Sequence, residues 1–277
     1  MTPAISAVRV FAPAKINLFL HVGDRRADGF HPLQSLAVFV DAGDELALER
    51  SDRLTLAIEG PFAEGLASGA DNLVIRAAHA LNATGRIVLT KNLPVASGIG
   101  GGSADAAAAL RGLDTHWDLN RGDLRDLAAT LGSDVPVCLD SKAAWMEGRG
   151  EALTPAAVPP QPMVLVNPRV GVSTAEVFRT LRSRTGVGMP LELSGDLVGF
   201  LRRMRNDLEA PARAIQPVIG DVLEALAAAP DILLARMSGS GATCFGLFAD
   251  DASATKAARI LSAGHPNWWV RAAKSLQ

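Results

Sequence analysis

Alternating apolar and polar positions mark the first sixty residues of the chain. Over 14–22 the even positions are Ala, Ile, Leu, Leu and Val, whereas the odd positions include a lysine, an asparagine and a histidine. A period of two is typical of a β-strand whose two faces meet different surroundings. This segment and its neighbours predict strands at 7–11, 16–22, 36–40, 45–49 and 54–58.

The rest of the chain mixes helical and strand patterns. Apolar spacing predicts helices at 72–83, 104–113, 123–131, 174–181, 195–204, 221–229 and 252–262. Short apolar runs predict strands at 87–90, 163–166, 232–236, 244–248 and 268–272. The closely spaced prolines of 155–162 predict an extended linker. Blocks of strands and helices without regular alternation indicate the α+β class.

Composition and charge narrow the classes of partner. The chain has 27 basic and 29 acidic residues, a net charge of −2, which argues against nucleic acid as a partner. The two cysteines, Cys138 and Cys244, have no metal-ligand spacing. No apolar run approaches the ~20 residues of a membrane span, and the N-terminal segment has no secretory pattern. We expect a cytoplasmic protein with no membrane partner.

The segment 93–110, LPVASGIGGGSADAAAAL, places glycines at 98, 100, 101 and 102 directly before a run of alanines. It lacks the Lys-Ser or Lys-Thr pair of a P-loop and the third glycine of a dinucleotide fingerprint. Glycines nevertheless allow backbone N–H groups to converge, and a helix start adds further unpaired N–H groups. Ser103 is the expected N-cap and could offer its hydroxyl to a phosphate or to Mg²⁺. This pattern favours a site for nucleotide phosphates over an ordinary flexible loop.

Three polar residues are candidates for chemistry. Lys15 and Asn17 lie on one face of the alternating segment 14–22, about 7 Å apart along the predicted strand. A solvated outer face is the alternative for that pair. Asp134, in LGSDVPVCL, could equally be a helix N-cap followed by a proline in the first turn. The residue patterns alone leave both alternatives open.

Three separated segments resemble the motifs of the GHMP kinase superfamily: PAKINLFLHV at 13–22, PVASGIGGGSADAAAAL at 94–110 and MSGSGATCFGLF at 237–248. Their order and spacing agree over essentially the whole chain. Segments at 26–36, 131–139, 148–151 and 205–209 resemble one branch of that superfamily. That branch phosphorylates the 2-hydroxyl of a cytidyl-linked methylerythritol in the non-mevalonate route to isoprenoid precursors.

The resemblance implies an α+β fold of two domains. The N-terminal ATP-binding domain, 1–158, would resemble domain 2 of ribosomal protein S5, and the C-terminal domain, 159–277, would be ferredoxin-like. The active site would lie in the cleft between them. ATP and Mg²⁺ are the implied cofactors, the small cytidyl compound is the implied substrate, and a monomer or homodimer is expected.

The resemblance also implies residue roles. Lys15 and Asp134 would be catalytic, and the segment Gly239, Ser240 and Gly241 would line the cleft. The ATP phosphate loop would comprise Pro94, Val95, Ala96, Ser97, Gly98, Ile99, Gly100, Gly101, Gly102, Ser103 and Ala104. The cytidyl substrate would contact Asn17, Phe30, His31, Thr174 and Phe178. The sequence departs from the family at Phe30, where tyrosine is frequent, and at Ser97, where glycine or alanine is frequent.

Two other functions remain compatible with these patterns. The first is another GHMP small-molecule kinase, such as a homoserine or mevalonate kinase, and the GFHPL and SDVPV segments argue against it. The second is a nucleotide-binding regulator that has lost catalysis, against which the retained Lys15 and Asp134 argue. Phe30 could also be a plain core residue beneath a turn.

Overall fold

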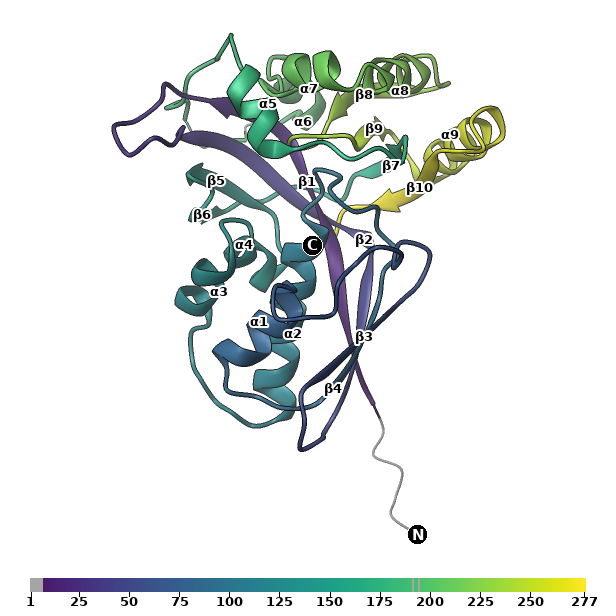
Figure 1. Cartoon of the computed structure of the whole chain (residues 1–277). Helices are drawn as coiled ribbons and strands as arrows, with labels where there is room; N and C mark the ends of the chain where they lie inside the picture. Colours follow the sequence, from purple (N-terminus) through teal and green to yellow (C-terminus); the bar gives the residue numbers. More distant parts are fainter. Residues whose placement is uncertain (1–6, 191, 194) are drawn as a thin grey trace. The chain divides into compact units, whose positions relative to one another are not determined.

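The computed structural model describes residues 7–190, 192, 193 and 195–277, which divide into two compact units (Figure 1). Unit 1 comprises 7–14, Gly43–Val95 and Gly100–Ser141, and unit 2 comprises Lys15–Ala42, Ala96–Ile99 and the described part of Lys142–Gln277. Strands β1 (Val8–Val22) and β2 (Leu33–Glu49) pair with each other, and each passes from one unit into the other.

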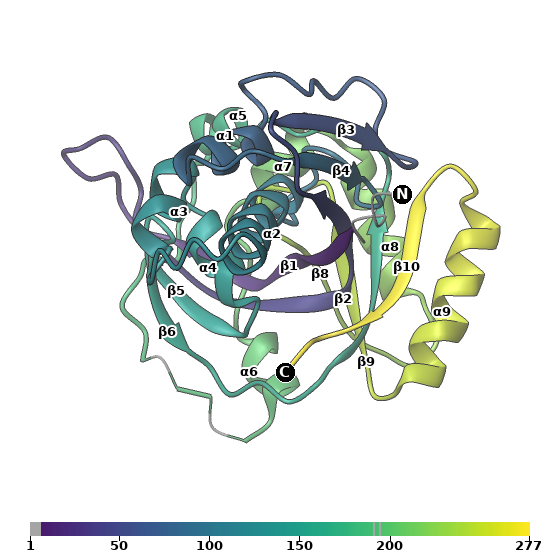
Figure 2. The same ribbon diagram turned by 90° about the horizontal axis from the view of Figure 1, so that it is seen from below.

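Unit 1 combines a small sheet with four helices. The second half of β2 pairs antiparallel with β4 (Arg86–Thr90), which pairs parallel with β3 (Thr55–Glu59). Helix α2 (Gly101–His116) packs against its three neighbours, which are grouped around it in Figure 2. These are α1 (Leu73–Ala80), α3 (Arg125–Leu131) and α4 (Val135–Asp140). The alanines at 106–109 are fully buried, so small side chains let the neighbouring helices approach α2 closely.

Unit 2 contains a four-stranded antiparallel sheet in the order β10-β7-β9-β8. Its strands are β7 (Pro162–Asn167), β8 (Ile232–Met237), β9 (Cys244–Phe248) and β10 (Trp269–Lys274). Between β7 and β8 lie α5 (Thr174–Thr180), α6 (Leu197–Arg202), α7 (Glu209–Ile215) and α8 (Val218–Ala227). Helix α9 (Asp251–Gly264) joins β9 to β10.

This connectivity is that of a ferredoxin-like unit, in which a strand–helix–strand arrangement occurs twice and the first strand lies inside the sheet. The expected ferredoxin-like architecture is therefore present in the C-terminal part of the chain. Apolar residues of β7 and β9 pack with those of α8 and α9, among them Val164, Phe248, Leu226 and Leu261.

The first half of β2 pairs with β5 (Ala144–Gly148), and β5 pairs with β6 (Ala152–Pro155).

Most predicted elements are present, with three differences. The strands predicted at 7–11 and 16–22 are one strand, β1, and those at 36–40 and 45–49 are one strand, β2. The helices and strands predicted from the patterns omit α4, α7 and the strand pair β5 and β6. Within the segment predicted to be an extended linker, residues 156–161 carry no helix or strand, and they lie inside unit 2. Among the described residues, no helix is long and apolar enough to cross a membrane.

Candidate active site

The glycine loop enters helix α2 earlier than predicted. Gly98 and Gly100 have φ values of 76° and 66°, in the left-handed region that favours glycine. Gly100 occupies the N-cap position of α2, and no side chain caps this end. The prediction that Ser103 is the N-cap is wrong, because left-handed Gly100 lets the helix begin at Gly101. Ser103 lies in the first turn, where the unpaired N–H groups and positive end of a 16-residue helix favour an anion.

Residues 96–99 of this loop lie against a second glycine segment in unit 2. Thr243 donates its backbone N–H to the Ser97 carbonyl at 3.0 Å. A Cβ added to Gly98 would lie 2.5 Å from the Ser238 carbonyl oxygen, and one added to Gly239 would lie 2.6 Å from the Gly98 oxygen. Both glycines are required by close approach of backbone to backbone. The structure therefore brings together two motifs that are widely separated in the sequence.

Lys15 and Asn17 are both buried, with 3% of each residue exposed. The solvated-face interpretation of this strand is therefore wrong. The Asn17 amide Nδ2 donates to Ser35 Oγ at 2.8 Å, and the Asn17 backbone N–H donates to Ser238 Oγ at 3.1 Å. The Lys15 backbone N–H donates to the Ile99 carbonyl at 3.0 Å. These contacts fix this part of β1 beside the glycine loop residues of unit 2.

Asp134 precedes α4 in unit 1, with Pro136 in the first turn of that helix. Its side chain makes no capping hydrogen bond, although the residue occupies the N-cap position. The structural alternative thus accounts for the position of Asp134 but gives its carboxylate no capping role. Helix α4 packs against α2, so Asp134 belongs to the same packed helical group as the end of the glycine loop.

The residues assigned to the cytidyl substrate form contacts within unit 2. The His31 ring stacks on Phe178, with centroids 6.0 Å apart and planes inclined by 23°. His31 Nδ1 is 2.9 Å from the Gly23 carbonyl oxygen. The hydroxyls of Thr174 and Ser240 are 2.8 Å apart. Two of the predicted substrate residues, His31 and Phe178, are therefore paired, and Thr174 contacts the second glycine segment.

Phe30 is 47% exposed, which excludes the core interpretation of this residue. The guanidinium carbon of Arg149 lies 3.7 Å above the centre of its ring. Arg149 belongs to a tight turn in which Glu151 Oε2 accepts the Arg149 backbone N–H at 2.6 Å. Arg149 is not among the site residues predicted from the sequence. The signal in the sequence was the GRGE segment at 148–151. The pairing of Gly148 with Leu33, which places this turn beside the Phe30 loop, is seen only in the structure.

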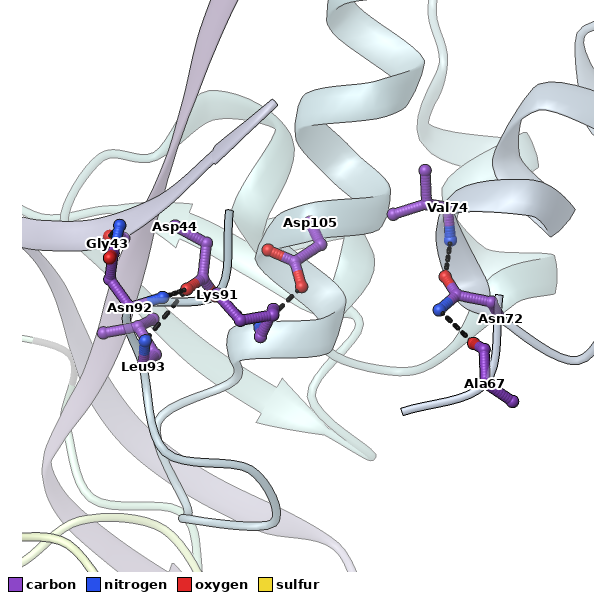
Figure 3. A network of polar contacts seen from close by, with 9 residues as sticks. All are labelled: Gly43, Asp44, Ala67, Asn72, Val74, Lys91, Asn92, Leu93 and Asp105. Atoms are coloured by element: carbon purple, nitrogen blue, oxygen red, sulfur yellow. Dashed lines mark hydrogen bonds and ion pairs between the residues drawn. The ribbon is translucent and has the colours of Figure 1, made fainter. Parts of the chain in front are cut away.

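A buried charge cluster was also missed (Figure 3). Lys91 Nζ lies 2.5 Å from Asp44 Oδ2 and 2.7 Å from Asp105 Oδ2. The side chains are at most 5% exposed. Burial raises the pKa of Asp105 to about 7 and Asp44 acts in the same direction, although Lys91 opposes them. Burial acts to lower the pKa of Lys91, but the two carboxylates hold it above its ordinary value.

The described part of the chain has no group of three His, Cys, Asp or Glu side chains that could together hold a metal ion. Kinase Mg²⁺ is bound largely through nucleotide phosphates and water, with one or two protein ligands. The hydroxyl of partly exposed Ser103, in the first turn of α2, is of the oxygen type that Mg²⁺ prefers.

Two family models match the chain. The GHMP kinases N terminal domain matches residues 72–142, and the GHMP kinases C terminal domain matches residues 190–267. Among solved structures, a crystal structure of 4-(cytidine 5'-diphospho)-2C-methyl-D-erythritol kinase is similar with a TM-score of 0.79 and 34% identity. The match covers 98% of this chain and 100% of that one. A homoserine kinase from Cytophaga hutchinsonii, at 20% identity and a TM-score of 0.68, shares the fold.

Curated relatives are more similar still. A protein of Dinoroseobacter shibae named 4-diphosphocytidyl-2-C-methyl-D-erythritol kinase is 54% identical over 275 residues, covering 97% of this chain and 95% of the relative. A protein of the same name from Rhodopseudomonas palustris is 48% identical over 294 residues, with 97% and 95% covered. The chain belongs to the 4-diphosphocytidyl-2-C-methyl-D-erythritol kinase family, within the GHMP kinases.

Proposed function

We propose that this chain transfers the γ-phosphoryl group of ATP to the 2-hydroxyl of 4-diphosphocytidyl-2-C-methyl-D-erythritol, giving the 2-phosphate and ADP. The reaction belongs to non-mevalonate isoprenoid precursor biosynthesis. The observation that carries the proposal is the identity of about half over nearly the full length to relatives of that name. The division into domains at 1–158 and 159–277, a cytoplasmic location and a monomeric or homodimeric state are part of the same proposal.

The ATP phosphates bind at Pro94–Ala104. Left-handed Gly98 and Gly100 let this backbone turn where a side chain would hinder it, and the start of α2 adds its unpaired N–H groups. Mg²⁺ supplies charge neutralisation of the phosphates when it is bound, and Ser103 is its candidate protein ligand. The remaining protein task is to hold the transferred group in line with the acceptor hydroxyl.

Asp134 accepts the proton of the substrate hydroxyl or orients that hydroxyl for attack. Its carboxylate has no capping role at α4. Lys15 stabilises negative charge at the attacking oxygen, because its ammonium is carried by a buried strand position rather than by a solvated surface. Phosphoryl transfer requires chiefly such positioning and charge stabilisation.

The cytosine ring of the substrate stacks on exposed Phe30, and Phe178 supports the site by packing against the face of His31. A carbonyl oxygen only accepts hydrogen bonds, so His31 Nδ1 donates to the Gly23 carbonyl, and in this tautomer Nε2 is the acceptor nitrogen of the ring. An acceptor suits the 4-amino group of cytosine and repels the 4-carbonyl group of uracil. Asn17 and Thr174 complete the proposed substrate contacts, and Gly239, Ser240 and Gly241 line the proposed site.

A substrate panel tests this function. ADP release is measured with the cytidyl substrate, its uridyl analogue, homoserine and mevalonate as phosphoryl acceptors. We expect turnover with the cytidyl substrate alone. Turnover with homoserine or mevalonate in its place would assign a different GHMP kinase, and nucleotide binding without turnover on any acceptor would assign a regulator.

A further inference from the structure

The buried cluster of Asp44, Lys91 and Asp105 joins three separate parts of unit 1 (Figure 3). Asp44 lies on β2, Lys91 directly follows β4, and Asp105 lies in the second turn of α2. The Lys91 ammonium forms an ion pair with both carboxylates. The cluster therefore ties the end of one strand to the beginning of the helix that follows the glycine loop.

The same cluster holds the backbone on both sides of that loop. Before it, Asp44 Oδ1 accepts the backbone N–H of Asn92 at 2.6 Å and of Leu93 at 2.9 Å. After it, a Cβ placed on Gly101 would lie 3.5 Å from Lys91 Nζ and 3.6 Å from Asp44 Oδ2. The first residue of α2 thus rests directly against the ion pair.

We propose that Asp44, Lys91 and Asp105 are positioning residues, which fix the chain immediately before and after the glycine loop and so set its affinity for nucleotide phosphate. This inference rests on the proposed role of the loop in ATP binding. If these ion pairs served only to stabilise the fold, apolar residues could replace them, because apolar residues of similar volume often stabilise a protein as well as a buried ion pair does. Here Asp105 Oδ1 has no hydrogen-bond partner among the described residues, which is a poor arrangement for stability alone.

The principal test is the double variant Lys91→Met/Asp105→Leu, which removes the ion pair and keeps the apolar volume. Asp44 retains its two backbone donors in this variant. Binding of ADP with Mg²⁺ and binding of cytidine are titrated on the full chain, together with the melting temperature. Glu49→Gln is the matched control, because it breaks an exposed ion pair with Arg86 in the same unit.

The double variant leaves the Asp44 carboxylate buried without its cation, so we expect it to melt below the wild-type temperature. We expect the folded variant to bind ADP about 10- to 100-fold more weakly and to bind cytidine normally, since a small misplacement at a site costs this much. Wild-type ADP affinity, or an equal loss for cytidine, would overturn the inference. Failure of the wild-type chain to bind ADP would instead overturn the proposed function of the loop.

A second pair of variants covers the case in which the double variant does not fold. Asp105→Asn keeps an oxygen that accepts from Lys91, whereas Asp105→Ala removes it. We expect Asp105→Asn to retain ADP affinity within about threefold and Asp105→Ala to lose about tenfold or more. Equal affinities of these two variants for ADP would contradict a positioning role for the contact.

Discussion

The contact between Arg149 and Phe30 fixes the orientation of the ring that we propose for stacking on the substrate base. An exposed phenylalanine ring is accessible to a ligand, but it needs a fixed orientation to stack on a nucleotide base. The Arg149 guanidinium supplies that restraint from 3.7 Å above the ring centre, and the short turn closed by Glu151 holds Arg149 in place. The missing tyrosine hydroxyl at this position is thus not required for ring orientation in this chain.

Replacing Phe30 with alanine tests the stacking role. Base–aromatic stacking contributes about 1–3 kcal/mol, so Phe30→Ala is expected to raise KM for the cytidyl substrate about five- to hundredfold. KM for ATP stays unchanged, and discrimination against the uridyl analogue survives because it depends on His31. Steady-state kinetics with each substrate varied in turn measure this. Equal changes in both KM values, or in neither, would exclude the stacking assignment.

At the scale of elements, the glycine loop combines two requirements that a side chain would violate. Gly98 needs a left-handed backbone, and it also needs the space that a Cβ would take from Ser238 and Gly241. A left-handed conformation alone costs a residue other than glycine about 1–2 kcal/mol. The close approach adds a clash with backbone atoms that have no flexible end to move aside.

Comparing Gly98→Ala with Gly65→Ala separates the effect of the close backbone approach from that of the left-handed conformation. Gly65 has nearly the same φ, 77°, but no atom lies within 4 Å of an added Cβ. We expect Gly98→Ala to weaken ADP binding about tenfold or more, and Gly65→Ala to leave it unchanged. Isothermal titration of both variants is the measurement. Identical ADP affinities in the two variants would mean that the close approach has no part in shaping the loop.

Elements that depend on local sequence properties were predicted, whereas features that depend on tertiary packing were not. Four glycines before an alanine run predicted the loop and its helix, because backbone freedom and helix propensity are local properties. The start of α2 was missed by three residues, since it depends on the backbone conformation of Gly100. The alternation in β1 grouped Lys15 with Asn17 but did not show that their face is buried. The pairing of Lys91 with Asp105 requires tertiary packing that no local pattern records.

At the scale of the whole molecule, the pH dependence of stability follows from carboxylates that the fold holds ionised. Asp207 has a fully buried side chain that accepts hydrogen bonds from the backbone of Val22 and Thr185 and pairs with Arg205. Burial acts to raise the pKa of Asp207, but these hydrogen bonds outweigh it and lower the pKa below its ordinary value. Asp207 therefore stabilises the fold above its unfolded-state pKa, and this stabilisation is lost as the pH falls through the lower, folded-state value.

Asp207→Asn is expected to lower the free energy of unfolding by about 1–3 kcal/mol at pH 7. The deficit shrinks on acidification, so the two proteins converge as the pH falls below 4. Melting temperatures between pH 7 and pH 3 measure this, with the exposed Asp52→Asn as control. A deficit that is independent of pH would show that the charge of Asp207 does not contribute.

Phosphorus NMR of the complete reaction follows the proposed phosphoryl transfer itself. Wild-type protein is incubated with ATP, Mg²⁺ and the cytidyl substrate, and Asp134→Asn is treated identically after its ADP affinity has been confirmed. We predict a new phosphomonoester signal with the substrate diphosphate intact, formed together with ADP, and a rate about 10²–10⁴ lower for the variant. Inorganic phosphate and ADP without a phosphomonoester, or an equal rate with Asp134→Asn, would contradict the proposed reaction.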